Sequence, residues 1–194
     1  MKSTDMICME KIENFEGKNL DIGEIEMKSF NCYWQEKEPV LKDINFEIKK
    51  GEYIGIVGKV GSGKSSLLRC IFKEVPKYRG YFNFQGRIAY VEQEPYIFNK
   101  IIKENIIFGA KYDEEYYNRV VQACCLVDDL KLFDYGDQTQ IGERGANISG
   151  GQKARISLAR AVYSQADIYL LDDPLSAVDS KVAKLLNENV IQGC

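Results

Sequence analysis

The sequence contains no histidine, and none of its apolar runs approaches the roughly 18 residues that a membrane-spanning helix needs. We therefore do not expect the chain to cross a bilayer by itself. Its start, MKSTDMICMEKIENFEGKN, lacks the apolar core of a secretory signal. The formal net charge of -3 provides no basic excess, which argues against a nucleic-acid partner.

Recognisable cysteine motifs are also missing. The six cysteines show no CxxC spacing and have no histidine to complete a zinc site, so neither a metal centre nor a disulfide framework is favoured. We interpret them as reduced, mostly buried thiols of a cytosolic protein. They stand at Cys8, Cys32, Cys70, Cys124, Cys125 and Cys194.

The 194 residues fit one domain, and 45% hydrophobic and 28% charged residues are ordinary globular usage. Residues 1–20 are polar and predict a flexible leader. Short apolar blocks from Ile25 onward, including YIGIV at 53–57, predict strands, and residues 99–136 predict helices. The last part predicts a helix from Ser149, a buried strand IYLLDD and a final helix. This order indicates an α/β fold with a helical insertion.

A glycine-rich segment, Gly58–Ser66, follows the predicted strand 53–57 and precedes a helical pattern. It fits G-x-x-x-x-G-K-[ST], in which loop amides and the helix N-terminus cradle phosphates. Lys64 supplies a positive charge, and Ser65 is placed to ligate Mg²⁺. The alternative is a strand-to-helix turn that binds nothing, which the additional Lys and Ser make improbable.

A second glycine pair lies in Ser149–Gln152, the sequence SGGQ. Ser149 and Gln152 fit a capping box, so this segment is at least a capped helix start. However, each glycine lowers helix propensity by nearly 1 kcal/mol relative to alanine, which a cap alone does not require. Glycines do allow a ligand to approach the bare amides closely.

Together with IYLLDDP at Ile168–Pro174, these motifs resemble the nucleotide-binding domain of an ATP-binding cassette (ABC) transporter. GKVGSGKSS resembles the Walker A motif, ISGGQ the signature and IYLLDD the Walker B motif, over roughly Ile25 to Cys194. The resemblance is greatest to the first such domain of the C subfamily, the multidrug-resistance-protein and cystic-fibrosis-channel group. It implies a P-loop NTPase (RecA-like) core over 21–98 and 157–194, an antiparallel β subdomain, a helical subdomain over 99–156 and a truncated C-terminus.

The resemblance also implies a set of site residues. Trp34 would stack on adenine, with Tyr33 as the substitute, although a core or edge-strand aromatic is the alternative. Gln93 resembles the Q-loop glutamine, and Ser65, Gln93 and Asp172 would hold Mg²⁺. The implied ATP-binding residues are Trp34, Gly58, Val60, Gly61, Ser62, Gly63, Lys64, Ser65, Ser66, Gln93, Ser149, Gly150, Gly151 and Gln152.

Catalysis is expected to be weak, with Lys64, Gln93 and Asp173 as the catalytic candidates. Family members that hydrolyse ATP well carry Glu where this chain has Asp173, and a carboxylate withdrawn by about 1 Å can cost about 100-fold in rate. The family's switch histidine is missing, because the chain ends before the corresponding strand. The resemblance therefore implies a degenerate ATP site in a fragment that is inactive or slow alone.

Further family features concern partners. The domains pair head to tail, so Ser149 and Gly151 would serve the partner's nucleotide. IGERG at Ile141–Gly145 resembles the X-loop of exporters, SAVD at Ser176–Asp179 resembles the D-loop, and Phe108 would contact the transmembrane domains or else lie in the core. These features place the chain at the cytosolic face of a membrane, within an integral membrane transporter.

Two other functions would use the same ATP-binding motifs. In the first, the domain is an ATP-gated regulatory clamp of a channel-like protein, and hydrolysis is incidental. The second is a DNA-maintenance ATPase of the same superfamily, which would carry a long coiled coil between Gln93 and Ser149. That interval is too short here, and the net charge is acidic.

Overall fold

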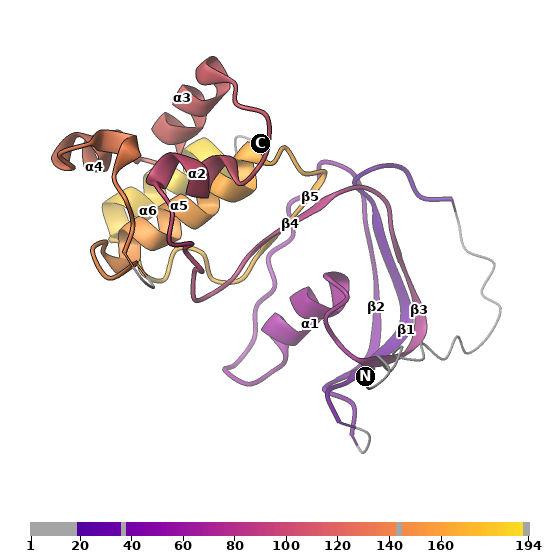
Figure 1. Ribbon diagram of the computed structural model, residues 1–194. Helices are drawn as coiled ribbons and strands as arrows, with labels where there is room; N and C mark the ends of the chain where they lie inside the picture. The colour runs from indigo at the N-terminus through magenta and orange to yellow at the C-terminus, as the bar shows by residue number, and fades with distance from the viewer. Residues whose placement is uncertain (1–18, 36–37, 143–144, 192–194) are drawn as a thin grey trace, which may run out of the picture. The chain divides into compact units, whose positions relative to one another are not determined.

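The computed structural model describes residues 19–35, 38–142 and 145–191 (Figure 1). It divides into two compact units, one up to Ile88 and one from Ala89 onward. The chain has a mixed α/β fold with an antiparallel and a parallel sheet. Of the expected leader, 1–18 lie outside the described residues.

Unit 1 contains a three-stranded antiparallel sheet in the order β2-β1-β3, which the apolar blocks from Ile25 onward correctly predict. Its strands are β1 (Ile25–Tyr33), β2 (Leu41–Ile48) and β3 (Lys77–Phe84). In the central strand, Met27 lies opposite both Phe46 of β2 and Phe82 of β3. The sheet forms because the apolar side chains that β1 buries lie beside apolar side chains of β2 and β3, and together they form one apolar face.

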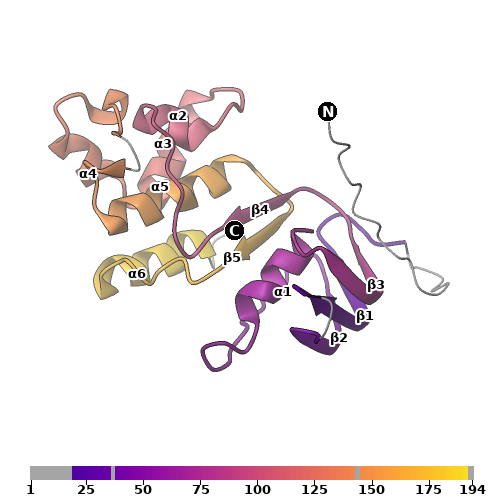
Figure 2. The ribbon, with the colours of Figure 1, turned by 60° about the horizontal axis from the view of Figure 1, so that its bottom comes forward.

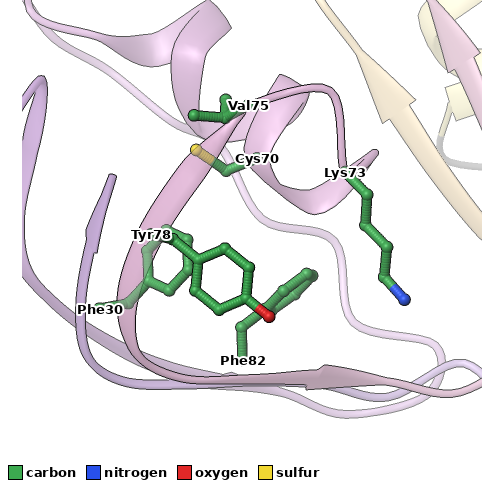
Figure 3. A pocket seen from close by; sticks show the side chains of 6 residues that line it. All are labelled: Phe30, Cys70, Lys73, Val75, Tyr78 and Phe82. Atoms are coloured by element: carbon green, nitrogen blue, oxygen red, sulfur yellow. The ribbon is translucent and has the colours of Figure 1, made fainter. Parts of the chain in front are cut away.

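Helix α1 (Lys64–Ile71) packs its buried residues Leu67, Leu68 and Cys70 in the same unit. Figure 3 shows the Cys70 thiol above the rings of Phe30, Tyr78 and Phe82. These side chains, with Lys73 and Val75, enclose a cavity of about 70 Å³. Ligand pockets usually measure about 300–1,000 Å³, so this space is a packing gap between α1 and the sheet and too small for a nucleotide.

The predicted strand at 53–57 is wrong. These residues form no strand, and Tyr53 and Val57 are 67% and 94% exposed. An apolar strand of this kind needs neighbours on both sides to take its backbone hydrogen bonds. The strands described in unit 1 are antiparallel and pair with one another, and no backbone hydrogen bond joins 53–57 to them.

Unit 2 combines a two-stranded sheet with a group of helices (Figure 2). Helices α2 and α3 pack on α5, and the shared core includes Ile102, Ile106, Val120 and Ile156. The elements are β4 (Ile88–Val91), α2 (Ile102–Ile107), α3 (Glu114–Ala123), α4 (Val127–Leu132), the 3₁₀ turn η1 (Gly136–Gln138), α5 (Gly150–Tyr163), β5 (Ile168–Leu171), α6 (Ser180–Leu186) and the π-helical turn η3 (Asn187–Ile191).

A buried polar network joins α2 to α5. Asn105 is fully buried, and its side chain accepts from the Phe98 amide at 2.9 Å and donates to the Phe98 carbonyl at 3.0 Å. Arg160 donates to the Asn105 side chain at 3.0 Å, to its carbonyl at 2.8 Å and to the Tyr96 carbonyl at 2.8 Å. Burial lowers the pKa of Arg160 to about 10, which leaves the guanidinium charged at neutral pH.

We expect Asn105→Ala to lower the free energy of unfolding by about 2–4 kcal/mol, because it removes the acceptor of the Phe98 amide and of one Arg160 N–H group and leaves a gap where a fully buried side chain stood. Urea unfolding of the chain measures this loss. Glu104→Ala is the matched control, since Glu104 is the exposed neighbour on the same helix and should change stability by less than about 0.5 kcal/mol. A loss below about 1 kcal/mol for Asn105→Ala would show that the network is dispensable.

Candidate functional site

The glycine-rich segment Gly58–Ser66, called the phosphate loop from here on, is closed by its own lysine. The Lys64 ammonium donates to the carbonyl oxygens of Gly58 at 2.9 Å and Lys59 at 3.0 Å. Val60 stands at the tip of the loop, and its side chain is fully exposed. The loop therefore bends around a single positive charge, as a phosphate-binding loop requires.

Gly63 makes the turn from the loop into α1. It precedes Lys64, the first helical residue, with a left-handed φ of 93°, a conformation that L side chains rarely adopt. A Cβ at this position would also lie 2.9 Å from Leu41 Cδ2. The left-handed φ favours glycine at this position, and the helix then begins directly at Lys64 with its first amides directed at the loop.

Trp34 is connected to the same helix. Its indole N–H donates to the Ser66 hydroxyl at 3.1 Å, and the ring is 38% exposed. The residue is therefore not part of the core, and it follows the end of β1 instead of lying within a strand, so neither form of the alternative, a core or an edge-strand aromatic, describes it. The hydrogen bond fixes an exposed aromatic ring beside the first turn of α1, in the same unit as the phosphate loop.

The predicted magnesium and catalytic residues of unit 2 meet at one edge of its sheet. Gln93 follows β4 and Asp172 follows β5, so both lie at the carboxyl ends of paired parallel strands. The Asp172 amide donates to the Val91 carbonyl at 2.9 Å, and its carboxylate accepts from Tyr90 Oη at 3.3 Å. Asp173, next in the chain, is exposed and has φ +49°.

The segment Ser149–Gln152, called the signature segment from here on, forms the complete capping box that its sequence predicts. Ser149 Oγ accepts from the Gln152 amide at 3.2 Å, and the Gln152 side chain accepts from the Ser149 amide at 2.8 Å. These bonds satisfy the first and last amides of the segment. The amides of Gly150 and Gly151, between them, have no intrahelical acceptor and donate to no acceptor in the described part of the chain.

Gly151 is needed because of its neighbours. A Cβ there would lie 3.1 Å from the Ala177 carbonyl oxygen and 3.5 Å from Arg155 Nη1. Ala177 belongs to the SAVD segment, which continues into α6 through the cap Asp179. The absence of a side chain therefore leaves the amides of Gly150 and Gly151 uncovered.

The predicted residues thus gather in two places. Unit 1 holds Trp34, Ser65 and Ser66 with the loop residues Gly58, Val60, Gly61, Ser62, Gly63 and Lys64, whereas unit 2 holds Gln93, Asp172, Asp173 and the signature segment. Of the predicted X-loop, 143–144 lie outside the described residues. Phe108 is 58% exposed and packs on Phe98 with ring centroids 4.9 Å apart, so it is not core.

Sequence reasoning missed the contact of Trp34 with Ser66 and the roles of Asp129, Asn105 and Arg160. Asp129 accepts from both Gln152 and Arg155 of α5, although it stands in a different helix. No local pattern points to such contacts, because they join residues distant in the chain.

A phosphate loop that opens a helix, together with an acid at the carboxyl end of a buried strand, defines the class of P-loop nucleotide-binding domains. Comparison with known proteins identifies the family. The family model described as "ABC transporter" matches residues 41–176.

Individual proteins with similar sequences belong to the same family. The chain is 50% identical over 164 residues to mouse "ATP-binding cassette sub-family C member 4", covering 84% of this chain and 12% of the relative. It is 48% identical over 184 residues to "Metal resistance protein YCF1" of Saccharomyces cerevisiae, covering 93% and 12%. It is 51% identical over 167 residues to "ABC transporter C family member 8" of Dictyostelium discoideum, covering 86% and 10%.

The chain therefore belongs to the ABC transporter family, and it is an ATP-binding cassette similar to those of the C subfamily. It spans only about one tenth of the length of these relatives. No helix in the described ranges is long and apolar enough to cross a membrane.

Proposed function

We propose that this cassette binds MgATP and pairs head to tail with a second cassette to drive transmembrane export. The observation that carries the proposal is the pairing of two phosphate-directed features on one chain. The phosphate loop bends around Lys64, and the signature segment leaves two adjacent amides uncovered. A domain that binds its own nucleotide and also contacts the nucleotide of a partner needs both features.

The residues of unit 1 would hold the nucleotide. Lys64 and the amides of the phosphate loop fit the phosphate tail, because they combine a positive charge with a helix N-terminus. The ring of Trp34, fixed by Ser66, would stack on the base. Such stacking contributes about 1–3 kcal/mol per base, so the phosphate contacts would carry most of the affinity.

The magnesium residues would be Ser65, Gln93 and Asp172. All three offer oxygen atoms, which are the ligands that Mg²⁺ prefers. When bound, Mg²⁺ would neutralise charge on the phosphate oxygens. Asp172 is 9% exposed, and the Tyr90 hydroxyl orients its carboxylate. A fixed orientation is what a carboxylate needs to serve as a magnesium ligand.

Hydrolysis at this cassette's own nucleotide would be slow. Asp173 carries a side chain one methylene shorter than Glu, and its backbone adopts a left-handed conformation that Asp tolerates better than most residues. Because its side chain is one methylene shorter, the Asp173 carboxylate reaches less far from the backbone than a Glu carboxylate would. In the proposed pair, this site is the degenerate one, and the signature segment completes the competent site opposite.

The transmembrane partner would dock at Phe108 and the Q-loop residue Gln93. Phe108 and Tyr96 are 58% and 63% exposed, and both pack on Phe98. Arg160 lies 5.0 Å from the Phe98 ring centroid and 5.3 Å from that of Phe108, so these rings are held in place. An exposed, prearranged aromatic cluster suits the insertion of a helix end from another domain.

Association with a second cassette tests the proposal. We expect sedimentation of the chain with the second cassette of its transporter to show a complex with Mg²⁺ and either ATP or a non-hydrolysable analogue. Gly151→Glu should abolish the complex, because the side chain would meet the Ala177 carbonyl and cover the amides. The exposed Lys42→Glu changes charge elsewhere and should not. A complex that forms equally well with and without nucleotide, or that still forms with Gly151→Glu, would overturn the head-to-tail arrangement.

A further inference from the structure

Asp129 connects α4 to the signature segment. Its two carboxylate oxygens accept from different residues of α5: Oδ1 from Gln152 Nε2 at 3.0 Å and Oδ2 from Arg155 Nη2 at 2.6 Å. The side chains of Arg155 and Asp129 are only 11% and 15% exposed. Such a short, largely buried and charged contact restricts both partners far more than a surface ion pair does.

The contact with Gln152 extends to the helix start. A side-chain amide has one carbonyl oxygen and one NH₂ group. In Gln152 the NH₂ group is bound by Asp129 and the oxygen accepts from the Ser149 amide. Asp129 therefore determines which way the amide of Gln152 points, and this orientation is the one that the capping box requires.

Asp129 also positions the guanidinium of Arg155 next to the signature segment. Its Nη1 lies 3.5 Å from the position of a Cβ on Gly151, so the guanidinium stands beside the uncovered amides. The ion pair with Asp129 holds it there. The amides and the guanidinium together form a compact group of donors of the kind that binds a phosphate.

The geometry points to Asp129 as a positioning residue for the signature segment: it orients Gln152 and Arg155 so that the Gly150 and Gly151 amides face the phosphate tail of the nucleotide held by the paired cassette. This inference rests on the proposed function, and it deepens it by adding a residue of α4 that touches no nucleotide. Because preorganised donors act most strongly on charge that develops during reaction, the effect belongs to turnover more than to binding.

The test compares Asp129→Asn with Asp128→Asn in the intact transporter that contains this cassette. We expect Asp129→Asn to lower kcat for ATP about tenfold with little change in KM, because it loosens a transition-state contact. Asp128 is the adjacent acid, 92% exposed and paired with Lys131 at the surface, so its variant should keep the kcat of the parent. Binding of ATP to the chain's own phosphate loop should not change in either variant.

A double-mutant cycle separates positioning from general stabilisation. If Asp129 acts partly through Gln152, adding Asp129→Asn to Gln152→Ala should lower kcat by less than Asp129→Asn lowers it in the parent, because only the effect through Arg155 remains, whereas independent effects would multiply. If Asp129→Asn does not fold, Asp129→Glu takes its place in the test, because it keeps the negative charge but moves the carboxylate away from Gln152 and Arg155. An unchanged kcat, or effects that multiply, would overturn the inference. If Gly151→Glu also leaves kcat unchanged, the proposed function fails instead.

Discussion

Lys64→Ala should weaken binding of a fluorescent ATP derivative by about 100-fold, which is the size of one strong charge-assisted contact with phosphate. The Lys64 ammonium lies inside the phosphate loop, where it contacts the carbonyls of Gly58 and Lys59. Alanine removes the charge but keeps the helix, since it has the highest helix propensity. Equilibrium titration in the presence of Mg²⁺ measures the change.

Lys59→Ala is the matched control. Its carbonyl takes part in the loop, but the exposed side chain is not needed to close it. We expect its affinity for the derivative to stay close to that of the parent. Thermal unfolding of both variants should match the parent, because Lys64 is only partly buried. If Lys64→Ala binds the derivative as well as the parent does, the phosphate loop is not the site.

Asp173→Glu should raise ATP turnover at this cassette's own site by about 10- to 100-fold, the gain expected when a carboxylate moves about 1 Å toward its working position. Glu adds one methylene and extends the carboxylate from the end of β5. The measurement is the steady-state ATPase rate of the cassette paired with its partner, with the partner's own site inactivated.

Asp167→Glu is the control for this gain, because it makes the same substitution just before the opposite end of β5. We expect it to leave turnover unchanged. The left-handed backbone at position 173 carries a small cost for Glu, so unfolding temperatures should accompany the rates. Equal turnover for Asp173→Glu and the parent would show that the shorter acid is not what limits the rate, and the idea of a degenerate site would be withdrawn.

The parts of this chain that could be predicted from sequence are those with local causes. The capping box of Ser149 and Gln152 needs only the spacing of two residues, and α1 needs only glycine before an apolar helical pattern. The strand β5 is short, apolar and bounded by acids, and it is found where expected. Local physics suffices in each case.

The rest depends on distant neighbours. Residues 53–57 have the composition of a strand, but a strand exists only when another supplies its hydrogen bonds. The segment after Asp113 has a continuous helical pattern, yet it breaks into α3 and α4 at Cys125, whose φ is +54°. Asp129 shows the same limit at the site, since its partners Gln152 and Arg155 lie in another helix.

The proposed function requires that the phosphate loop around Lys64 bind the phosphate tail of ATP. Isothermal titration of the folded chain with ATP and Mg²⁺ tests it most directly, with AMP titrated in parallel because it carries the same base without the phosphate tail. We expect one saturable ATP site for each chain, with AMP bound far more weakly. No heat of binding for ATP up to millimolar concentration, or equal affinity for ATP and AMP, would contradict it.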